Sequence, residues 1–497
     1  MVTCRRRRPE RMELELGLDP DDAARLPRLA LLAPLKSSRT RSRAVRIVWH
    51  DGLGGALAEQ GLVIVEERPG WRLERLLPNA KRWPPGAPAP VLATGRDPSA
   101  LGHALPDPIV PMAAFEGRTL SMVLAGDHGS VTLTLLNGAV RAVAAEHRAS
   151  RIVLAGDEAA VLAVALALAG EVRAAVPRSS LAAEAFSAMR GGIPPPPRHQ
   201  GAPELPAGQS VADAFAYVVG HLTDVILHVA PAASDGQDGP EPVHQMRVAV
   251  RRLRSAIKVF RRAVRCPPVD AADAGLKALA ARLGPTRDWD VFVTETAAKV
   301  GAAFPTEPKL HGLLAAAERR RHACHAELRD YLQGAEFRRL GIELACLAGG
   351  DAWQATLGEA ATNELATPLN EFAGTVLTRR LERLAQLDDD IETLEPAALH
   401  AIRIRAKRLR YAAEIFASLY PGKPTKKFIR RLGTLQDRLG ALNDGAVAVT
   451  LLGELGSNRL AFASGVVLGF VGAHGRPTRE RIARAWRKFH RLAPFWN

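Results

Sequence analysis

The sequence predicts a multidomain α+β protein, in which an N-terminal antiparallel β-barrel precedes an all-α domain built from a repeated unit. Short apolar segments punctuated by Gly, Pro, Asp and Asn fill the first third of the chain, a pattern typical of antiparallel strands. A Gly/Pro-rich segment follows near residue 191. Beyond it, apolar residues recur at helical spacing, and one segment recurs 156 residues downstream, which indicates a duplicated helical unit.

Composition narrows the class of protein and of ligand. The chain has 497 residues and a formal charge of +15, which predict more than one domain and an acidic partner. The four cysteines form no CxxC pair, which indicates a reducing compartment. Acidic residues rather than an apolar run follow the first arginines, and the longest apolar run, 159–169, is too short to span a bilayer. We therefore expect a cytoplasmic protein without a membrane segment.

The predicted strands of the first domain begin at residues 12–18, where polar and apolar side chains alternate. A short helix is expected at 19–32. The further strands are expected at 44–49, 61–67, 71–77, 119–124, 131–136, 139–145 and 151–154. Arg68-Pro69-Gly70 and Asn137-Gly138 have turn chemistry. Seven or eight antiparallel strands with such turns predict a barrel or a strongly curved sheet.

The domain boundary is expected in the segment 191–207. Two glycines and four consecutive prolines in it, GGIPPPP, form a stiff, extended linker. We therefore assign residues 1–190 to the first domain and 208–497 to the second. The internal repeats of the second domain lie near 208–300 and 365–455, and Ser210 with Asp213 predicts the start of its first helix.

The repeat is clearest at a basic segment. The sequence HQMRVAVRRLR at 244–254 returns as HAIRIRAKRLR at 400–410, and the register continues without a gap over roughly fifty residues. On a helix, each copy carries an apolar stripe beside a basic stripe. The apolar stripes are Met246, Val250, Leu253, Ile257 and Phe260, and Ile402, Ala406, Leu409, Ala413 and Phe416. The basic stripes are His244, Arg247, Arg251, Arg254 and Lys258, and His400, Arg403, Lys407 and Arg410.

A column of like charges destabilises the free protein, because cations three or four residues apart on a helix repel each other. A polyanion lying along the column would relieve this repulsion and release counterions. For either copy taken alone, the alternative to ligand binding is a charged helix face that contacts only solvent. The recurrence of His, Arg, a basic residue and Arg at the same relative positions favours ligand binding.

The doubled motif resembles the conserved histidine α-helical domain, CHAD, over about residues 208–497. In that family, two pseudo-symmetric helical bundles form a basic central groove that binds inorganic polyphosphate. The resemblance implies polyphosphate-binding positions at His244, Arg247, Arg251, Arg252, Arg254, Lys258, His400, Arg403, Lys407, Arg408 and Arg410. Lys427 and Arg431, from a later basic cluster, are further candidates because they extend the positive surface. The resemblance also implies association with polyphosphate granules. The paired segments that end at Asp288 and Asp444 match a second family motif, which we interpret as helix-terminal, with Gly284 and Gly440 as helix breaks.

The first domain resembles a degenerate CYTH, or triphosphate-tunnel, domain, because it opens with Glu13-x-Glu15. Such barrels hold a triphosphate on a ladder of Arg and Lys and use carboxylates for a divalent metal. Here the ladder is eroded, with Gly17, Val65 and Glu67 near the positions of expected cations. We therefore expect no catalytic residues and no cofactor. Glu13 and Glu15 remain weak metal candidates, and Mg²⁺ or Mn²⁺ would be needed only by an active barrel.

Three alternatives to polyphosphate binding stay open. One is a hydrolase of triphosphate or polyphosphate acting at the barrel. Another is a nucleic-acid-binding protein, which is disfavoured because the basic stripes carry almost no aromatic residues for base stacking. A third is a scaffold that joins granules to another protein. Protein partners cannot be named from the sequence.

Overall fold

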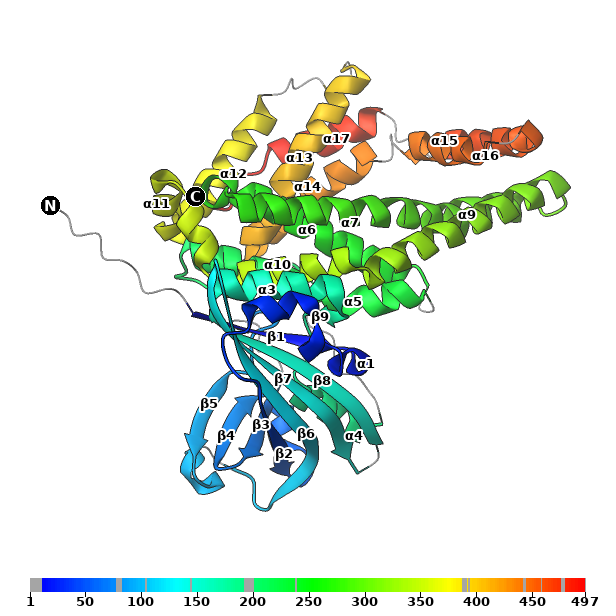
Figure 1. Cartoon of the computed structure of the whole chain (residues 1–497). Helices are drawn as coiled ribbons and strands as arrows, with labels where there is room; N and C mark the ends of the chain where they lie inside the picture. The colour runs from blue at the N-terminus through cyan, green and yellow to red at the C-terminus, as the bar shows by residue number, and fades with distance from the viewer. Residues whose placement is uncertain are drawn as a thin grey trace.

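The computed structural model divides the chain into a curved antiparallel sheet and a set of helices stacked above it (Figure 1). It describes residues 11–76, 83–102, 105–143, 145–191, 201–236, 239–386, 391, 394–440, 444–456, 458–474 and 479–496. Most of the polyproline linker predicted at 191–207 lies outside these residues. The strands come from the first part of the chain, and the elements described from Val211 onward are all helices.

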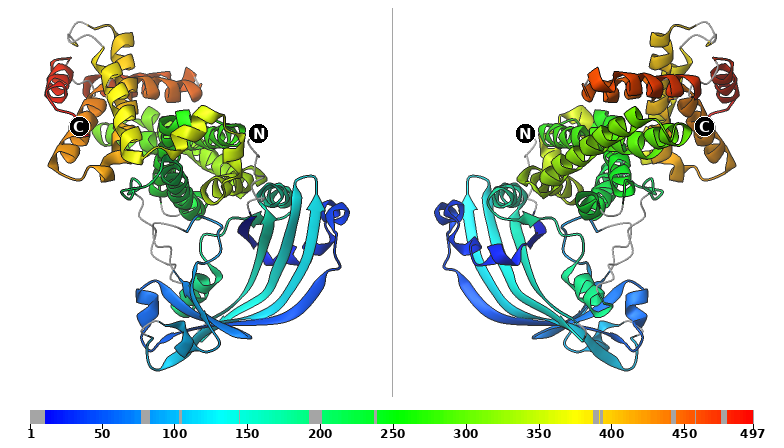
Figure 2. Two further views of the ribbon diagram at one scale, coloured as in Figure 1. Left: turned by 90° about the vertical axis from the view of Figure 1, so that its left-hand side faces the viewer. Right: turned by 90° about the vertical axis from the view of Figure 1, so that its right-hand side faces the viewer.

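Nine strands form one sheet in the order β5-β4-β3-β2-β6-β7-β8-β1-β9. The strands are β1 Arg11–Leu18, β2 Arg41–Gly52, β3 Leu62–Glu67, β4 Gly70–Arg75, β5 Val91–Gly95, β6 Ile109–Gly126, β7 Gly129–Ala142, β8 Ala145–Asp157 and β9 Ala174–Ala175. Among the described residues β5 and β9 are the two edges, and no pairing joins them. The sheet is strongly curved but open (Figure 2), so the expected closed barrel is not found.

Two local predictions in the first domain are wrong. Asn137 and Gly138 do not form a turn but lie inside β7, opposite Arg118 and Gly117 of β6. A Cβ added at Gly138 would lie 2.7 Å from the Cα of Gly117, so glycine here allows close approach of two long strands. The predicted helix at 19–32 is broken into α1, Pro20–Ala23, and two short 3₁₀ segments. The turn at Arg68-Pro69 is confirmed, since β3 ends at Glu67 and β4 begins at Gly70.

Two helices cover the sheet. α3, Glu158–Glu171, packs against β1, β7 and β8, and α4, Leu181–Met189, packs against β6, β7 and β8. α3 also connects the sheet to the helical part, because it packs on α10, Ala335–Gly349. The Glu158 carboxylate accepts the backbone N–H groups of Asp351 and Ala352 at 3.0 and 2.9 Å. One apolar core therefore runs from the sheet into the helices.

The helical part contains the repeated unit. Its helices are α5 Val211–Asp235, α6 Glu241–Val264, α7 Pro267–Val291, α8 Ala298–Ala303, α9 Pro308–Gln333, α10, α11 Glu359–Ala366, α12 Leu369–Ala385, α13 Pro396–Phe416, α14 Lys423–Gly440, α15 Asp444–Glu454, α16 Ala461–His474 and α17 Arg479–His490. Given the 156-residue offset, α5, α6 and α7 correspond to α12, α13 and α14. The predicted capping box at Ser210 and Asp213 is confirmed at the start of α5.

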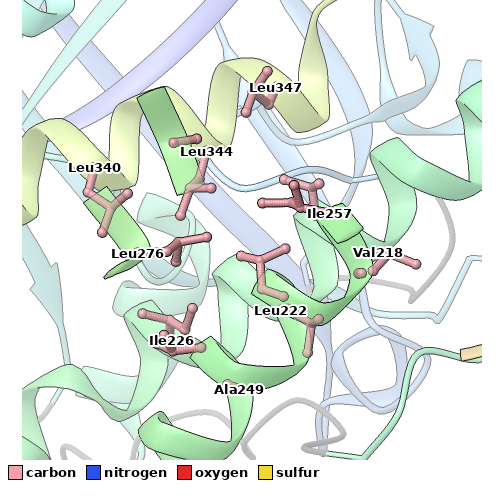
Figure 3. Close-up of a cluster of buried hydrophobic side chains, with 14 of the residues drawn as sticks. Val218, Leu222, Ile226, Ala249, Ile257, Leu276, Leu340, Leu344 and Leu347 are labelled. Carbon is pink, nitrogen blue, oxygen red and sulfur yellow. The ribbon is translucent and has the colours of Figure 1, made fainter. Parts of the chain in front are cut away.

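The apolar stripes predicted in the two copies are buried. Met246, Leu253 and Phe260 of α6 have no exposed surface, and neither do Ile402, Leu409 and Phe416 of α13. Figure 3 shows Leu222, Ile226, Ile257, Leu276 and Leu344 from α5, α6, α7 and α10 in one cluster. Burying an aliphatic side chain of this size contributes about 1.5–3 kcal/mol. This core fixes the rotation of α6 and α13, and so the direction in which their basic stripes point.

One described helix, α5, is long and apolar enough to cross a membrane, but 61% of its most apolar window is buried inside the protein. It packs against α6 and α10, which is the environment of a core helix. Its hydropathy is therefore explained by burial within the protein.

Candidate functional site

The basic stripes of the two repeat copies meet between α6 and α13, which pack against each other. Lys407 of α13 lies in the electrostatic field of Arg403 on its own helix and of Arg247, Arg251 and Lys258 on α6. We call these five residues the central basic cluster. Burial of Lys407 and the four neighbouring cations lower its pKa to about 8. The structure thus brings together side chains that are about 150 residues apart in sequence.

Tyr411 lies beside two members of this cluster. The Arg251 guanidinium carbon is 5.7 Å from the Tyr411 ring centroid, and the Lys407 Nζ is 5.8 Å from it, within the range of a cation–π interaction. The Tyr411 side chain is buried, and its hydroxyl has no hydrogen-bond partner among the described residues. Burial raises the pKa of Tyr411, so the phenol remains a neutral donor near pH 7.

Arg403 also has an unused donor. Its Nε is buried and has no hydrogen-bond partner in the described part of the chain. An unsatisfied buried N–H costs about 1–3 kcal/mol. A bound anion could accept hydrogen bonds from this Nε–H group and from the Tyr411 hydroxyl.

Other predicted site residues are held by acidic side chains. Arg247 donates to the Gly284 carbonyl at 2.9 Å and to Asp288 at 3.1 Å, both on α7. Arg254 pairs with Asp273 at 2.8 Å. Arg410 pairs with Glu414 of its own helix at 2.7 Å. The free positive charge is therefore concentrated at Arg251, Lys258, Arg403 and Lys407 rather than along the whole of each stripe.

These contacts revise the interpretation of the second motif. Gly284 lies inside α7 and does not end it, although Gly440 is the last residue of α14. The Asp288 carboxylate pairs with the Arg247 guanidinium of the first motif. Its role is therefore to orient Arg247 rather than to end a helix. The side chain of its repeat counterpart, Asp444, lies outside the described residues.

The two motif histidines lie in the first turns of their helices. His244 is half-buried, and burial lowers its pKa, with further lowering by Arg287, Arg251 and Arg247. It is therefore mainly neutral at pH 7 and adds little positive charge to the site. His400 is exposed.

Arg252, Arg408, Lys427 and Arg431 lie at the margins of this arrangement. Arg252 is half-buried, and Arg408 and Lys427 are exposed. The Arg408 carbonyl accepts from Arg380. Arg431 lines a separate pocket between α14 and α17.

Three contributors were missed by the sequence analysis. They are Arg287, Arg380 and Tyr411. Arg380 of α12 bridges the two motif helices by donating to the carbonyls of Arg408 at 2.5 Å and Lys258 at 3.3 Å. Burial, with Arg408 and Arg383, lowers the Arg380 pKa to about 10. The repeat could not reveal these residues, because Asn443, Asp224 and Ser255 stand at the equivalent positions.

Glu13 and Glu15, the weak metal candidates of the sheet, lie in different environments. Glu15 accepts from Arg151 at 3.0 Å, and the same guanidinium pairs with Glu184 of α4. Burial raises the pKa of Glu15, while Arg151 lowers it. Glu13 is exposed. Within the described residues no group of three His, Cys, Asp or Glu side chains could hold a metal ion.

Comparisons with known proteins identify the family of the helical part. Residues 216–453 match the model of the CHAD domain family. The CHAD domain of the plant Ricinus communis is 30% identical, with 60% of this chain and 98% of that chain covered and a TM-score of 0.49. No curated protein matches the chain.

Two more distant solved structures also match. PptA from Streptomyces chartreusis is 15% identical, with 57% of this chain and 99% of that chain covered and a TM-score of 0.41. HpAC1 from Hippeastrum, described as having a dominant triphosphatase activity, is 16% identical, with 38% of this chain and 99% of that chain covered and a TM-score of 0.26. The family match and the 30% identity over nearly the whole Ricinus communis domain show that this chain belongs to the CHAD domain family.

Proposed function

We propose that this protein binds inorganic polyphosphate through the central basic cluster. The observation that carries the proposal is the convergence of cations from both repeat copies on Lys407, which lowers its pKa to about 8. Few acidic side chains neutralise this convergence, so the free protein is destabilised there. A bound polyanion would remove the repulsion and release its own counterions.

The chemistry of the cluster favours a dense phosphate chain over a nucleic acid. Arginine guanidinium groups at 251 and 403 match the geometry of phosphate oxygens, and the buried donors of Arg403 and Tyr411 can point to them. Proteins that bind single-stranded nucleic acids commonly stack the bases on exposed aromatic side chains. Tyr411, the aromatic residue of the cluster, is only 5% exposed and lies under Arg251 and Lys407.

The shape of the site is part of the proposal. We infer a two-fold basic groove between the two repeat copies, in which α6 and α13 contribute equivalent faces. The basic stripe of α6 from His244 to Lys258 would be about 21 Å long at 1.5 Å per residue. Such a surface would hold several consecutive phosphates and would tolerate different chain lengths. Association with polyphosphate granules would follow from this binding.

Hydrolysis of triphosphate at the sheet is not favoured by the geometry. The Glu15 carboxylate, which would be a metal ligand, is held by Arg151. We expect no release of phosphate from tripolyphosphate with Mg²⁺ or Mn²⁺. Metal-dependent release that is lost in Glu15→Ala would overturn this expectation and support the hydrolase alternative.

Fluorescence anisotropy of end-labelled long-chain polyphosphate with the full chain tests the proposal. The double variant Arg251→Ala with Lys407→Ala removes two cations without breaking an ion pair of the fold. Replacing two phosphate contacts should reduce the salt slope, d log K/d log [salt], by about 1.4 if each contributes as on single strands. The matched control is Lys299→Ala with Arg319→Ala, since both residues are exposed and lie on α8 and α9.

Two results would overturn the proposal. One is an unchanged affinity and salt slope in the Arg251/Lys407 variant. The other is equal competition per charge by DNA or RNA, which would make the central basic cluster a general basic surface. Circular dichroism of both double variants should show that they keep the helical content of the wild type.

A further inference from the structure

A second basic site lies between α14 and α17. An open pocket of about 260 Å³ lies on the surface between the two helices. Its polar lining consists of Arg431, Thr434, Arg438, Arg481, Arg484 and Lys488. We call it the α14–α17 pocket. α17 lies beyond the segment that matches the family model, which ends at 453.

The pocket arises from the same spacing on both helices. Residues 431, 434 and 438 of α14 are separated by three and four positions, and so are residues 481, 484 and 488 of α17. This spacing places each set on one face of its helix. The apolar faces beside them pack together, with Phe428 and Phe489 rings 5.2 Å apart and Trp486 only 1% exposed. Apolar burial therefore holds two cationic columns opposite each other.

Few acids neutralise these cations. Arg484 pairs with Glu480, but both side chains are more than half exposed, so the pair is weak. No described acidic side chain forms an ion pair with Arg431, Arg438, Arg481 or Lys488. The charge of the pocket is thus available to a ligand.

The α14–α17 pocket is distinct from the central basic cluster. On α14, Arg410 of α13 approaches Gly433 and Gln436. These positions and the pocket positions 431, 434 and 438 lie on opposite flanks of the buried Leu432 and Leu435, about 160° apart around the helix. One anion lying along α13 would therefore not contact both sites.

We propose that the α14–α17 pocket binds a compact inorganic phosphate anion with several phosphate groups. Three arginines and a lysine without an acidic partner in the described part of the chain, together with Arg484, provide forked and point-charge donors for phosphate oxygens. The lining has no aromatic side chain, so it offers no platform for a nucleotide base. The ligand chemistry is a linear oligophosphate, either free or as the end of a longer chain.

Calorimetric titration with tripolyphosphate tests this site. The titration uses full-length protein that carries Arg251→Ala and Lys407→Ala, so that the central basic cluster does not contribute. Binding is expected in this background. Adding Arg438→Ala and Arg481→Ala should weaken it about tenfold or more, because each replaces a charge-assisted contact. Adding Arg430→Ala and Arg491→Ala, two exposed arginines outside the pocket, should leave the Kd within about twofold.

An unchanged Kd after Arg438→Ala and Arg481→Ala, or no binding in the starting background, would overturn the proposal. Neither result would bear on polyphosphate binding at the central basic cluster. That binding is tested separately, by comparing the anisotropy of labelled polyphosphate with the wild type and with the Arg251/Lys407 variant. Competition by long-chain polyphosphate identifies the source. If long-chain polyphosphate displaces tripolyphosphate in proportion to the concentration of chain ends, the pocket binds the terminal phosphates of a chain. If long-chain polyphosphate does not displace it, the ligand is a free oligophosphate.

Discussion

Phe260 and Phe416, which occupy the same position in the two repeat copies, meet edge to face with ring centroids 5.8 Å apart. Both side chains are completely buried. Phe372 of α12 stacks on Phe260 at 5.5 Å and lies 6.3 Å from Phe416. This aromatic cluster joins α6, α12 and α13, and so it positions the two motif helices that carry the central basic cluster.

Removing one ring should therefore weaken both the fold and the site. We expect Phe260→Ala to lower the free energy of unfolding by about 3–5 kcal/mol, because it leaves a cavity between the two copies. Denaturation by urea followed by circular dichroism measures the loss. Phe260→Leu should lower the free energy of unfolding clearly less. A loss below about 1 kcal/mol in Phe260→Ala would contradict this prediction, because it would show that neighbouring side chains fill the cavity.

Lys407 should stabilise the ligand complex but destabilise the free protein. The pKa of Lys407 is lowered to about 8 in the folded protein. Between about pH 8 and the higher pKa of this lysine in the unfolded chain, the unfolded chain binds more protons than the folded protein. The free energy of unfolding therefore rises with pH over this range. We expect Lys407→Met, which keeps much of the side-chain volume, to raise Tm at pH 7. The gain should shrink as the pH rises through this range, where wild-type Lys407 is already neutral. A lower Tm for the variant at pH 7 would contradict this assignment.

Polyphosphate affinity should depend on pH above neutrality. A bound polyanion favours protonated Lys407, so binding takes up a proton and weakens as the pH rises past about 8. We expect affinity to fall about tenfold between pH 7 and pH 9 if the bound pKa returns to its usual range. Arginine side chains keep their charge over this range, and Tyr411 stays neutral because burial raises its pKa.

Lys407→Arg is the control for this pH dependence, because arginine keeps its charge at pH 9. Its affinity for long-chain polyphosphate should be nearly constant from pH 7 to pH 9. Anisotropy at constant ionic strength measures both proteins. An equal fall in Lys407→Arg and wild type would place the titrating group elsewhere.

Arg151 should be essential for the stability of the sheet domain. It is 8% exposed and joins Glu15 of β1 to Glu184 of α4. Arg151→Ala would leave two partly buried carboxylates without a counter-charge, and we expect a loss of about 3–5 kcal/mol. Arg148→Ala on the same strand removes an exposed pair with Asp21 and should cost no more than about 0.5 kcal/mol. Comparable losses in thermal melts of the two variants would refute the structural role of Arg151.

The sequence by itself determined the repeated unit, the burial of its apolar stripes and most strands of the sheet. These features are local, since the helical and strand periods place side chains on faces without reference to distant residues. The 156-residue register correctly pairs α6 with α13 and places Leu276 and Leu432 in the core. The resemblance to CHAD followed from this register and is confirmed by the family match.

Only the tertiary structure decided which cations are neutralised and where the sheet ends. The partners of Arg254 and Arg410 are Asp273 and Glu414, which are not equivalent in the two copies, so the repeat could not predict them. Tyr411 belongs to one copy alone, and the sheet stays open because no pairing joins β5 to β9 among the described residues. Ion pairing and sheet closure depend on distances between segments far apart in the chain, which helical or strand periodicity does not encode.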